Sequence, residues 1–151
     1  MAFTSRPLME STDAAALNIG EDFEDEVCLS NAEVAIILEK QKINYVEQKK
    51  TFTRAFKKTE SYVLRFTGTR DPLVNQASVI ELREALQSIS FEHDDEVHRL
   101  EEFEIACLSN LNPEGAEEAV ALIPSLSKHF TDNEIEEILG MISRLTAKIF
   151  S

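Results

Sequence analysis

Two histidines flank the most acidic loop of the sequence, and their side chains are the first that could bind a metal or take part in catalysis. His93 and His98 bracket Asp94, Asp95 and Glu96. Their spacing does not place both imidazole rings on one helix face, and no cysteine accompanies them as a zinc ligand. A calcium loop is excluded as well, because the central glycine and the alternating Asp and Asn ligands are missing. We therefore expect a solvated acidic loop, with a metal or hydrolytic site as the weaker alternative.

The other side chains with reactive chemistry lie far apart in the sequence. Cys28 and Cys107 are 79 positions apart, and neither has a metal-ligand pattern around it. Free thiols in a reducing compartment are the expected state. The four glycines are too scattered to build a phosphate-binding loop, and no nucleophile elbow is present. The sequence therefore predicts a protein that is not an enzyme and that carries no cofactor.

Charge is distributed along the chain in blocks of alternating sign. The formal net charge is −13, from 28 acidic and 15 basic residues. Residues 1–38 carry −7, residues 39–70 carry +6 and residues 71–151 carry −12. This balance argues against indiscriminate DNA binding, because the phosphate backbone has to be met by clustered Lys and Arg. Only the basic segment, residues 39–70, is left as a nucleic-acid surface.

Aromatic residues interleave with the cations of the basic segment, a composition typical of a stacking platform for single-stranded nucleic acid. The candidate RNA-facing residues are Lys49, Lys50, Lys57 and Lys58. The alternative is that Phe52, Phe56 and Phe66 are core anchors and that the basic residues form a solvated face. The sequence also leaves open whether Lys49 and Lys50 lie in a loop or in a continuous helix.

The spacing of apolar residues predicts a protein built of helices. Two helices are expected in residues 23–70 and four in residues 75–151, because apolar residues recur there at three and four positions. Capping boxes are expected at Ser30–Glu33, Ser78–Glu81 and Thr131–Glu134. Asn112 followed by Pro113 predicts one further helix start. The expected fold class is therefore all-α.

These patterns divide the chain into three parts. Residues 1–22 read as an acidic flexible tail, residues 23–70 as a partner-binding segment with two helices, and residues 75–151 as a helical bundle. In the segment, the second helix runs from about Thr51 to a stop at Gly68. In the bundle, one helix is expected to run from Val97 to about Asn110.

The apolar faces of residues 23–70 have no obvious place to be buried. They must pack on the bundle, on each other or on another chain, since each wet Val, Leu, Ile or Phe forgoes about 1.5–3 kcal/mol. The short apolar stretch Val27–Leu29 could add to the edge of a partner's sheet. No secretory signal and no apolar run long enough to span a bilayer are seen, so we expect an intracellular, soluble protein without a membrane partner.

Several strings of residues carry a resemblance to a known family. They are Leu29–Glu39, Phe103–Pro113 and Ala116–Leu126, and four residues of the second helix match too: Thr59, Tyr62, Arg65 and Phe66. From about residue 23 to the C-terminus, the chain resembles the fourth subunit of RNA polymerase II. The tail and the acidic insert at residues 91–96 look individual to this sequence.

The resemblance implies a fold, a partner and a location. The C-terminal helices would form a domain similar to the helicase-and-RNase-D C-terminal (HRDC) fold. The chain would pair with the seventh subunit, which carries an RNA-binding barrel, and the heterodimer would dock on the polymerase core as a non-catalytic stalk. That stalk would support initiation and lie near nascent RNA, which this chain would meet weakly or indirectly. The location would be the nucleus, with shuttling to the cytoplasm left open.

The resemblance also implies which apolar residues meet the partner. They are Val27, Leu29, Val34, Ile37, Leu38, Leu122, Ile123, Pro124 and Leu126. The alternative is packing within the chain's own bundle, and helix-end packing explains Ile123 and Pro124 equally well. The alternative function is a free-standing RNA-binding helical module that uses the basic segment.

Overall fold

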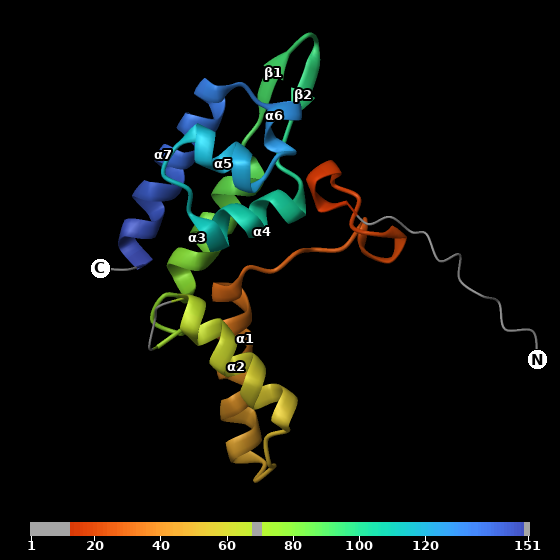
Figure 1. Cartoon of the computed structure of the whole chain (residues 1–151). Helices are drawn as coiled ribbons and strands as arrows, with labels where there is room; N and C mark the ends of the chain where they lie inside the picture. The colour runs from red at the N-terminus through yellow and green to blue at the C-terminus, as the bar shows by residue number, and fades with distance from the viewer. Residues whose placement is uncertain (1–12, 68–70, 150–151) are drawn as a thin grey trace, which may run out of the picture.

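A computed structural model describes residues 13–67 and 71–149 (Figure 1). These residues are mostly helical, so the all-α prediction is confirmed. The α-helices of the described ranges are α1 (Asn31–Glu47), α2 (Arg54–Thr67), α3 (Gln76–Ser88), α4 (Glu102–Leu111), α5 (Ala116–Leu122), α6 (Leu126–His129) and α7 (Asp132–Ile149). The strands β1 (Phe91–His93) and β2 (Glu96–His98) form a two-stranded hairpin between α3 and α4. No helix in these ranges has the length and apolarity to cross a membrane.

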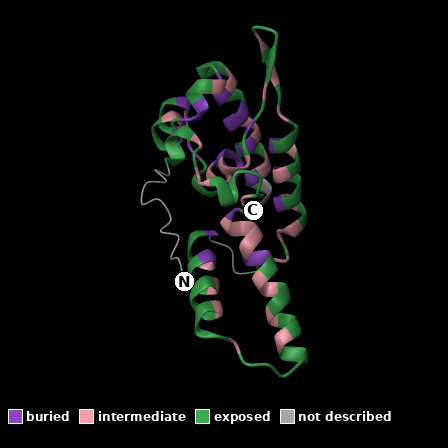
Figure 2. Ribbon diagram, turned by 90° about the vertical axis from the view of Figure 1, so that its right-hand side faces the viewer, coloured by how far each residue is buried: buried purple, intermediate pink, exposed green. Residues whose placement is uncertain are grey.

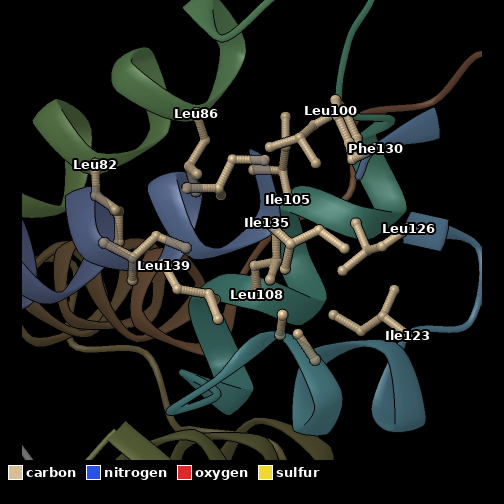
Figure 3. Packing of buried hydrophobic residues seen from close by; sticks show 14 of the residues in the cluster. Leu82, Leu86, Leu100, Ile105, Leu108, Ile123, Leu126, Phe130, Ile135 and Leu139 are labelled. Atoms are coloured by element: carbon tan, nitrogen blue, oxygen red, sulfur yellow. The ribbon is translucent and has the colours of Figure 1, made fainter. Parts of the chain in front are cut away.

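Helices α3 to α7 form the bundle, and aliphatic side chains from all of them fill its core (Figure 3). Leu86 of α3, Leu108 of α4 and Ile142 of α7 are each 0% exposed. Helix α7 supplies one continuous apolar face, because its buried residues recur at three and four positions. These residues are Ile135, Ile138, Leu139 and Ile142. At about 1.5–3 kcal/mol for each buried side chain, this cluster is the main source of stability in the molecule.

Helices α1 and α2 form a hairpin of their own that projects from one end of the bundle, opposite the β1–β2 hairpin (Figures 1 and 2). The only buried residues of the two helices are Ala35, Ile36, Val63 and Thr67. Figure 2 shows that burial in both helices is concentrated where they approach the bundle. The far half of the hairpin is therefore a two-layer structure with little interior.

A small aromatic cluster holds the tip of the α1–α2 hairpin together. The ring of Tyr45 lies 5.6 Å from that of Phe52 and 5.7 Å from that of Phe56, and the two phenylalanine rings are stacked at 5.1 Å. Closer to the bundle, Lys42 and Glu60 form an ion pair at 3.4 Å. Phe52 and Phe56 are thus packing residues, one of the two readings that the sequence left open.

Two of the three expected capping boxes are present. The amide of Glu33 donates to Ser30 Oγ at 3.3 Å, and the amide of Ser30 donates to the Glu33 carboxylate at 3.0 Å. Thr131 and Glu134 make the same reciprocal pair, at 3.3 and 2.8 Å. The box expected at Ser78 is wrong, because α3 has already begun two residues earlier and Ser78 lies inside it.

The helix start expected at Asn112 is also wrong. Asn112 ends α4 in the left-handed conformation, with φ 43°, and its amide donates to the carbonyl of Leu108 at 3.0 Å. Asparagine tolerates this conformation at a helix end better than most residues. Helix α5 begins only at Ala116, so the same residue type that often caps a helix start here closes the preceding helix.

The acidic insert is a β-hairpin rather than a loop. Asp94 and Asp95 have φ of 55° and 62°. Positive φ at both central residues is the geometry of the tight two-residue turn that joins the strands of a hairpin. The pairing sets His93 opposite Glu96 and Phe91 opposite His98. Val97 therefore belongs to β2, and the expectation that it opens a helix is wrong. Short-range turn chemistry overrides the apolar spacing that suggested the helix.

The two histidines of this hairpin lie face to face. Their rings are stacked at 4.0 Å, and His93 Nε2 lies 3.4 Å from the Glu134 carboxylate on α7. Phe91 anchors the hairpin base by edge-on contact with Phe130 at 5.9 Å. Across the described ranges, no three or more His, Cys, Asp or Glu side chains are placed to hold a metal ion.

Two of the sequence predictions concern residues that lie at least partly outside the described ranges. Residues 1–12 of the expected acidic tail and the expected stop at Gly68 lie there. The rest of that tail contains two single-turn 3-10 helices, η1 (Ala14–Ala16) and η2 (Glu21–Phe23). Asp13 caps η1 by accepting a hydrogen bond from the amide of Ala15 at 3.1 Å.

Candidate partner-binding surface

The stretch that precedes α1 is held against the bundle through its cysteine. The carbonyl of Cys28 accepts a hydrogen bond from Arg83 Nη2 at 2.6 Å, and its amide donates to the Glu102 carboxylate at 3.4 Å. Val27 and Leu29, on either side, are 60% and 44% exposed. Neighbouring side chains of extended backbone point in opposite directions, so holding Cys28 turns Val27 and Leu29 outward.

Arg83 of α3 is the hub that joins three parts of the chain. Its Nη2 donates to Glu33 of α1 at 2.7 Å as well as to the carbonyl of Cys28, and its Nη1 donates to Glu102 of α4 at 2.9 Å. The forked guanidinium suits this role, because it can donate to several carboxylate oxygens at once. One side chain of α3 therefore helps to set the direction in which α1 leaves the bundle, together with the packing of Ile36 into the core.

Electrostatics around Arg83 favour the charged states of both Arg83 and Glu33. Burial raises the pKa of Glu33, but the hydrogen bonds from Arg83 and Ser30 outweigh it and hold that pKa below its ordinary value. The hydrogen bond with Glu33 in turn raises the pKa of Arg83, a gain that burial partly offsets and Glu102 supports. The arginine and its carboxylates are thus a stable ion-pair network at neutral pH.

A further contact fixes the first turn of α1. The amide of Asn31 donates to the side-chain oxygen of Asn110, at the end of α4, at 2.8 Å. Ser30, the residue that caps α1, is 3% exposed. Four amides at the start of a helix lack partners within it, and here a side chain from the bundle takes up one of them.

The sequence-predicted residues on α1 divide between two sides of the helix. Ile37 is 45% exposed. Val34 and Leu38 are half-buried. Leu38 lies seven residues before Tyr45, which contacts α2, so helical periodicity places Leu38 on the side of α1 that faces α2. Ile37 is therefore the predicted α1 residue most available to a partner.

The predicted residues around the end of α5 divide in the same way. Leu122 is 49% exposed, and Pro124 is exposed too. Ile123 and Leu126 are 2% and 1% exposed and belong to the core of the bundle. At the end of α5 the amide of Ile123 donates to the carbonyl of Ala119 at 2.7 Å, so Ile123 continues the helical spacing of the buried Ala116 and Ala119. We therefore leave Ile123 and Leu126 out of the surface.

Other exposed apolar residues on the α1–α2 hairpin were not among the predicted partner residues. Ile43 and Val46 of α1 are 44% and 65% exposed, and Tyr62 and Phe66 of α2 are 56% and 57% exposed. Phe66 is thus not a core anchor, contrary to one of the two readings of the basic segment. Comparing each apolar position of α1 and α2 with the helix face that packs against the other helix could have identified these residues as exposed.

The two cysteines lie within electrostatic reach of each other. Burial raises the pKa of the Cys28 thiol, and the Glu102 charge adds to that effect. Burial also raises the pKa of Cys107, with smaller contributions from Cys28 and Glu104. A raised pKa keeps a cysteine protonated and poorly nucleophilic, so neither thiol has the properties of a catalytic nucleophile.

Comparison with known proteins gives one family. The RNA polymerase Rpb4 family matches residues 28–146. The chain is 36% identical to DNA-directed RNA polymerase II subunit 4 of Arabidopsis thaliana, over 89% of this chain and 93% of the relative. It is 34% identical to subunit rpb4 of Dictyostelium discoideum, over 91% of both chains, and 32% identical to that of Schizosaccharomyces pombe, over 88% and 90%. The match covers the α1–α2 hairpin and nearly all of the bundle. The chain therefore belongs to the RNA polymerase Rpb4 family.

Proposed function

We propose that this protein is a non-catalytic subunit of DNA-directed RNA polymerase II that pairs with the barrel-containing seventh subunit to form a stalk. Family membership and relatives named as RNA polymerase II subunits support this proposal. The stalk would support transcription initiation and the handling of nascent RNA. The protein would work in the nucleus, where this polymerase acts.

The observation that carries the proposal is a set of exposed apolar side chains on a segment that the bundle holds in place. Val27, Leu29 and Ile37 are 44–60% exposed, while Arg83 and Glu102 fix the backbone beside them. Burial of each such side chain in a complex contributes about 1.5–3 kcal/mol before the costs of association. A pre-ordered apolar segment is what an obligate partner needs, because little entropy is lost when it docks.

The extended stretch beside α1 also suggests how the partner binds. The backbone of Cys28, between Val27 and Leu29, is hydrogen-bonded to the bundle. The side chains of Val27 and Leu29 are exposed. Addition of this stretch to a sheet edge or apolar groove of the barrel subunit would cover both side chains. Leu122 and Pro124 would then be a second, smaller contact, and Val34 and Leu38 would support the helix from its inner side.

The test is co-purification of the tagged chain with the barrel subunit from cells that produce both. Val27→Asp is expected to reduce recovery of the barrel subunit at least tenfold, because a charge would be buried at the interface. Val97→Asp is the matched control, since Val97 is 54% exposed and lies in the β1–β2 hairpin at the far end of the bundle. Equal recovery with both variants would contradict the proposed surface.

The same purification separates the proposal from its alternative. A free-standing RNA-binding module would be recovered alone or with RNA, without polymerase core subunits or the barrel subunit. Recovery of the core and of the barrel subunit in near-equal amount would exclude that alternative.

A further inference from the structure

We propose that the outer face of α2 is a binding stripe for single-stranded RNA, formed by Arg54, Lys58, Tyr62, Arg65 and Phe66. This inference deepens the RNA-handling part of the proposed function by giving this chain its own contact site. It replaces the tip lysines, Lys49 and Lys50, as the centre of the predicted RNA surface, and it keeps Lys57 at the margin of the stripe.

Helical periodicity gathers these residues on one side of α2. Arg54, Lys58 and Tyr62 follow each other at four residues, and Arg65 and Phe66 extend the row by another turn. All five are exposed. Phe56 and Val63, which face α1 or the bundle, occupy the opposite side. Phe66, at the end of the stripe, also borders a pocket lined by residues of α1, α3 and α4. At about 1.5 Å per residue, the stripe is roughly 18 Å long and runs from the hairpin tip towards the bundle.

The aromatic residues of the stripe differ from those at the hairpin tip. Tyr45, Phe52 and Phe56 satisfy each other in a cluster and are only half-exposed. Tyr62 and Phe66 also lie against each other, with centroids at 4.7 Å and planes tilted by 48°, but both remain more than half exposed. Two aromatic side chains are therefore available to stack on bases, an interaction that tolerates any base sequence.

The charge of the stripe is the reverse of that of the chain. Glu60 is the only carboxylate of α2, and it pairs with Lys42 on the side that faces α1. Among the described residues, Arg54, Lys57 and Lys58 take part in no ion pair. The guanidinium of Arg65 lies over the Phe66 ring, 5.6 Å from its centre, and brings a cation to the aromatic pair. In a protein of net charge −13, this acid-free face attracts a polyanion.

The combination of cations and open rings favours RNA over an acidic protein segment. A carboxylate-rich segment would meet the cations but would leave the aromatic faces without a partner. Each nucleotide of a single strand offers a phosphate and a flat base together, and proteins that bind such strands pair basic grooves with aromatic side chains for this reason. An acidic or apolar protein surface is therefore treated as an outcome of the test.

The test is fluorescence anisotropy of the full chain with a labelled oligouridine of about 12 nucleotides, within the site size of such proteins. Binding is expected at about 50 mM salt, and the logarithm of the affinity should fall with the logarithm of the salt concentration with a slope of about −2, as three phosphate contacts require. The double variant Tyr62→Ala/Phe66→Ala should weaken binding at least tenfold. Tyr62→Phe, which keeps the ring, should bind as the unmodified chain does.

Two matched controls accompany these variants. Phe23→Ala removes an aromatic side chain of similar exposure, 59%, from the acidic N-terminal segment, and Lys128→Gln removes an exposed cation from α6. Neither should change RNA binding by more than about twofold if the stripe is the site. Circular dichroism of each variant checks that the helices are retained.

Three results would overturn the proposal. They are no binding of the oligouridine by the unmodified chain at low salt, binding that the double aromatic variant leaves unchanged, and loss of the barrel subunit by that variant while RNA binding persists. The last would identify the stripe as a protein interface. The first two results are independent of the pairing test with Val27→Asp, and the third presupposes that the unmodified chain recovers the barrel subunit. Failure of the RNA site and failure of the proposed heterodimer therefore remain distinguishable.

Discussion

Helices α3 to α7 enclose fully buried side chains such as Leu86, Leu108 and Ile142, whereas the two helices of the α1–α2 hairpin, 17 and 14 residues long, bury only four residues. The bundle is held by its own core. The hairpin is held at its base by the bundle and at its tip by three aromatic rings. Local stability follows buried apolar contact, so the bundle is a rigid platform and the hairpin an arm whose exposed faces are free for partners.

The two regions also differ in charge, and that difference has a structural basis. The basic segment 39–70 covers most of the hairpin, while residues 71–151 carry −12. The junction between them is the Arg83 network, in which a bundle arginine meets one carboxylate from α1 and one from α4. The arm is thus joined to the platform at its base only, by this ion-pair network and by Ile36 of α1, which belongs to the core cluster of the bundle.

The largest expected effect breaks the platform. Leu108→Ala should lower the free energy of unfolding by about 2–5 kcal/mol, because it opens a cavity at a fully buried position. Phe56→Ala, in the half-buried cluster of the arm, should cost clearly less. Urea unfolding followed by circular dichroism measures both. Equal costs would show that the tip of the arm is packed as tightly as the core of the bundle and would contradict the comparison.

An intermediate effect cuts the junction. Arg83→Ala should lower the free energy of unfolding by about 2–3 kcal/mol, because it leaves the carboxylates of Glu33 and Glu102 without their charged partner. Hydrogen exchange should then rise in residues 28–38 and stay unchanged in α7. Arg99→Ala is the matched control, since Arg99 is exposed and lies in the link between β2 and α4. Equal loss of protection in α7 would mean that arm and platform unfold together.

Much of the platform could be predicted from the sequence because its signals are local. Apolar residues at helical spacing identified α7, and the reciprocal side-chain and amide pairs at Ser30 and Thr131 formed as expected. The failures have local causes too. Asn112 suits both ends of a helix, and a two-residue Asp turn made a β-hairpin where acidity alone suggested a loop.

The surface was harder to predict than the fold. An apolar residue on a helix reads the same whether its own core or another chain covers it. The sequence therefore left Ile123 open between core and partner and did not separate Leu126 from Leu122. The Arg83 network links positions 50 and 19 residues apart, and no sequence spacing announces it. The exposure of Tyr62 and Phe66 likewise depends on how α2 is rotated against α1, which only the three-dimensional packing decides.

The smallest expected effect sharpens the comparison through pH. Hydrogen bonds from Arg83 and Ser30 hold the pKa of Glu33 below its ordinary value of 4.5. The Glu33 carboxylate therefore takes up a proton more readily in the unfolded chain than in the folded one. The stabilisation is therefore present above about pH 4.5 and is lost as the pH falls through the lower pKa of the folded state.

Glu33→Gln tests this link between charge and attachment of the arm. The variant should be about 1 kcal/mol less stable than the unmodified chain at pH 7, and the gap should shrink as the pH falls below the ordinary pKa of 4.5 and the unfolded chain takes up the proton more readily than the folded one. Urea unfolding across this range measures the gap, with Glu47→Gln, an exposed position on the same helix, as the control. A gap that stays constant down to pH 3 would mean that Glu33 supports α1 through its shape in the capping box, and the ion pair with Arg83 would then contribute little to joining the two regions.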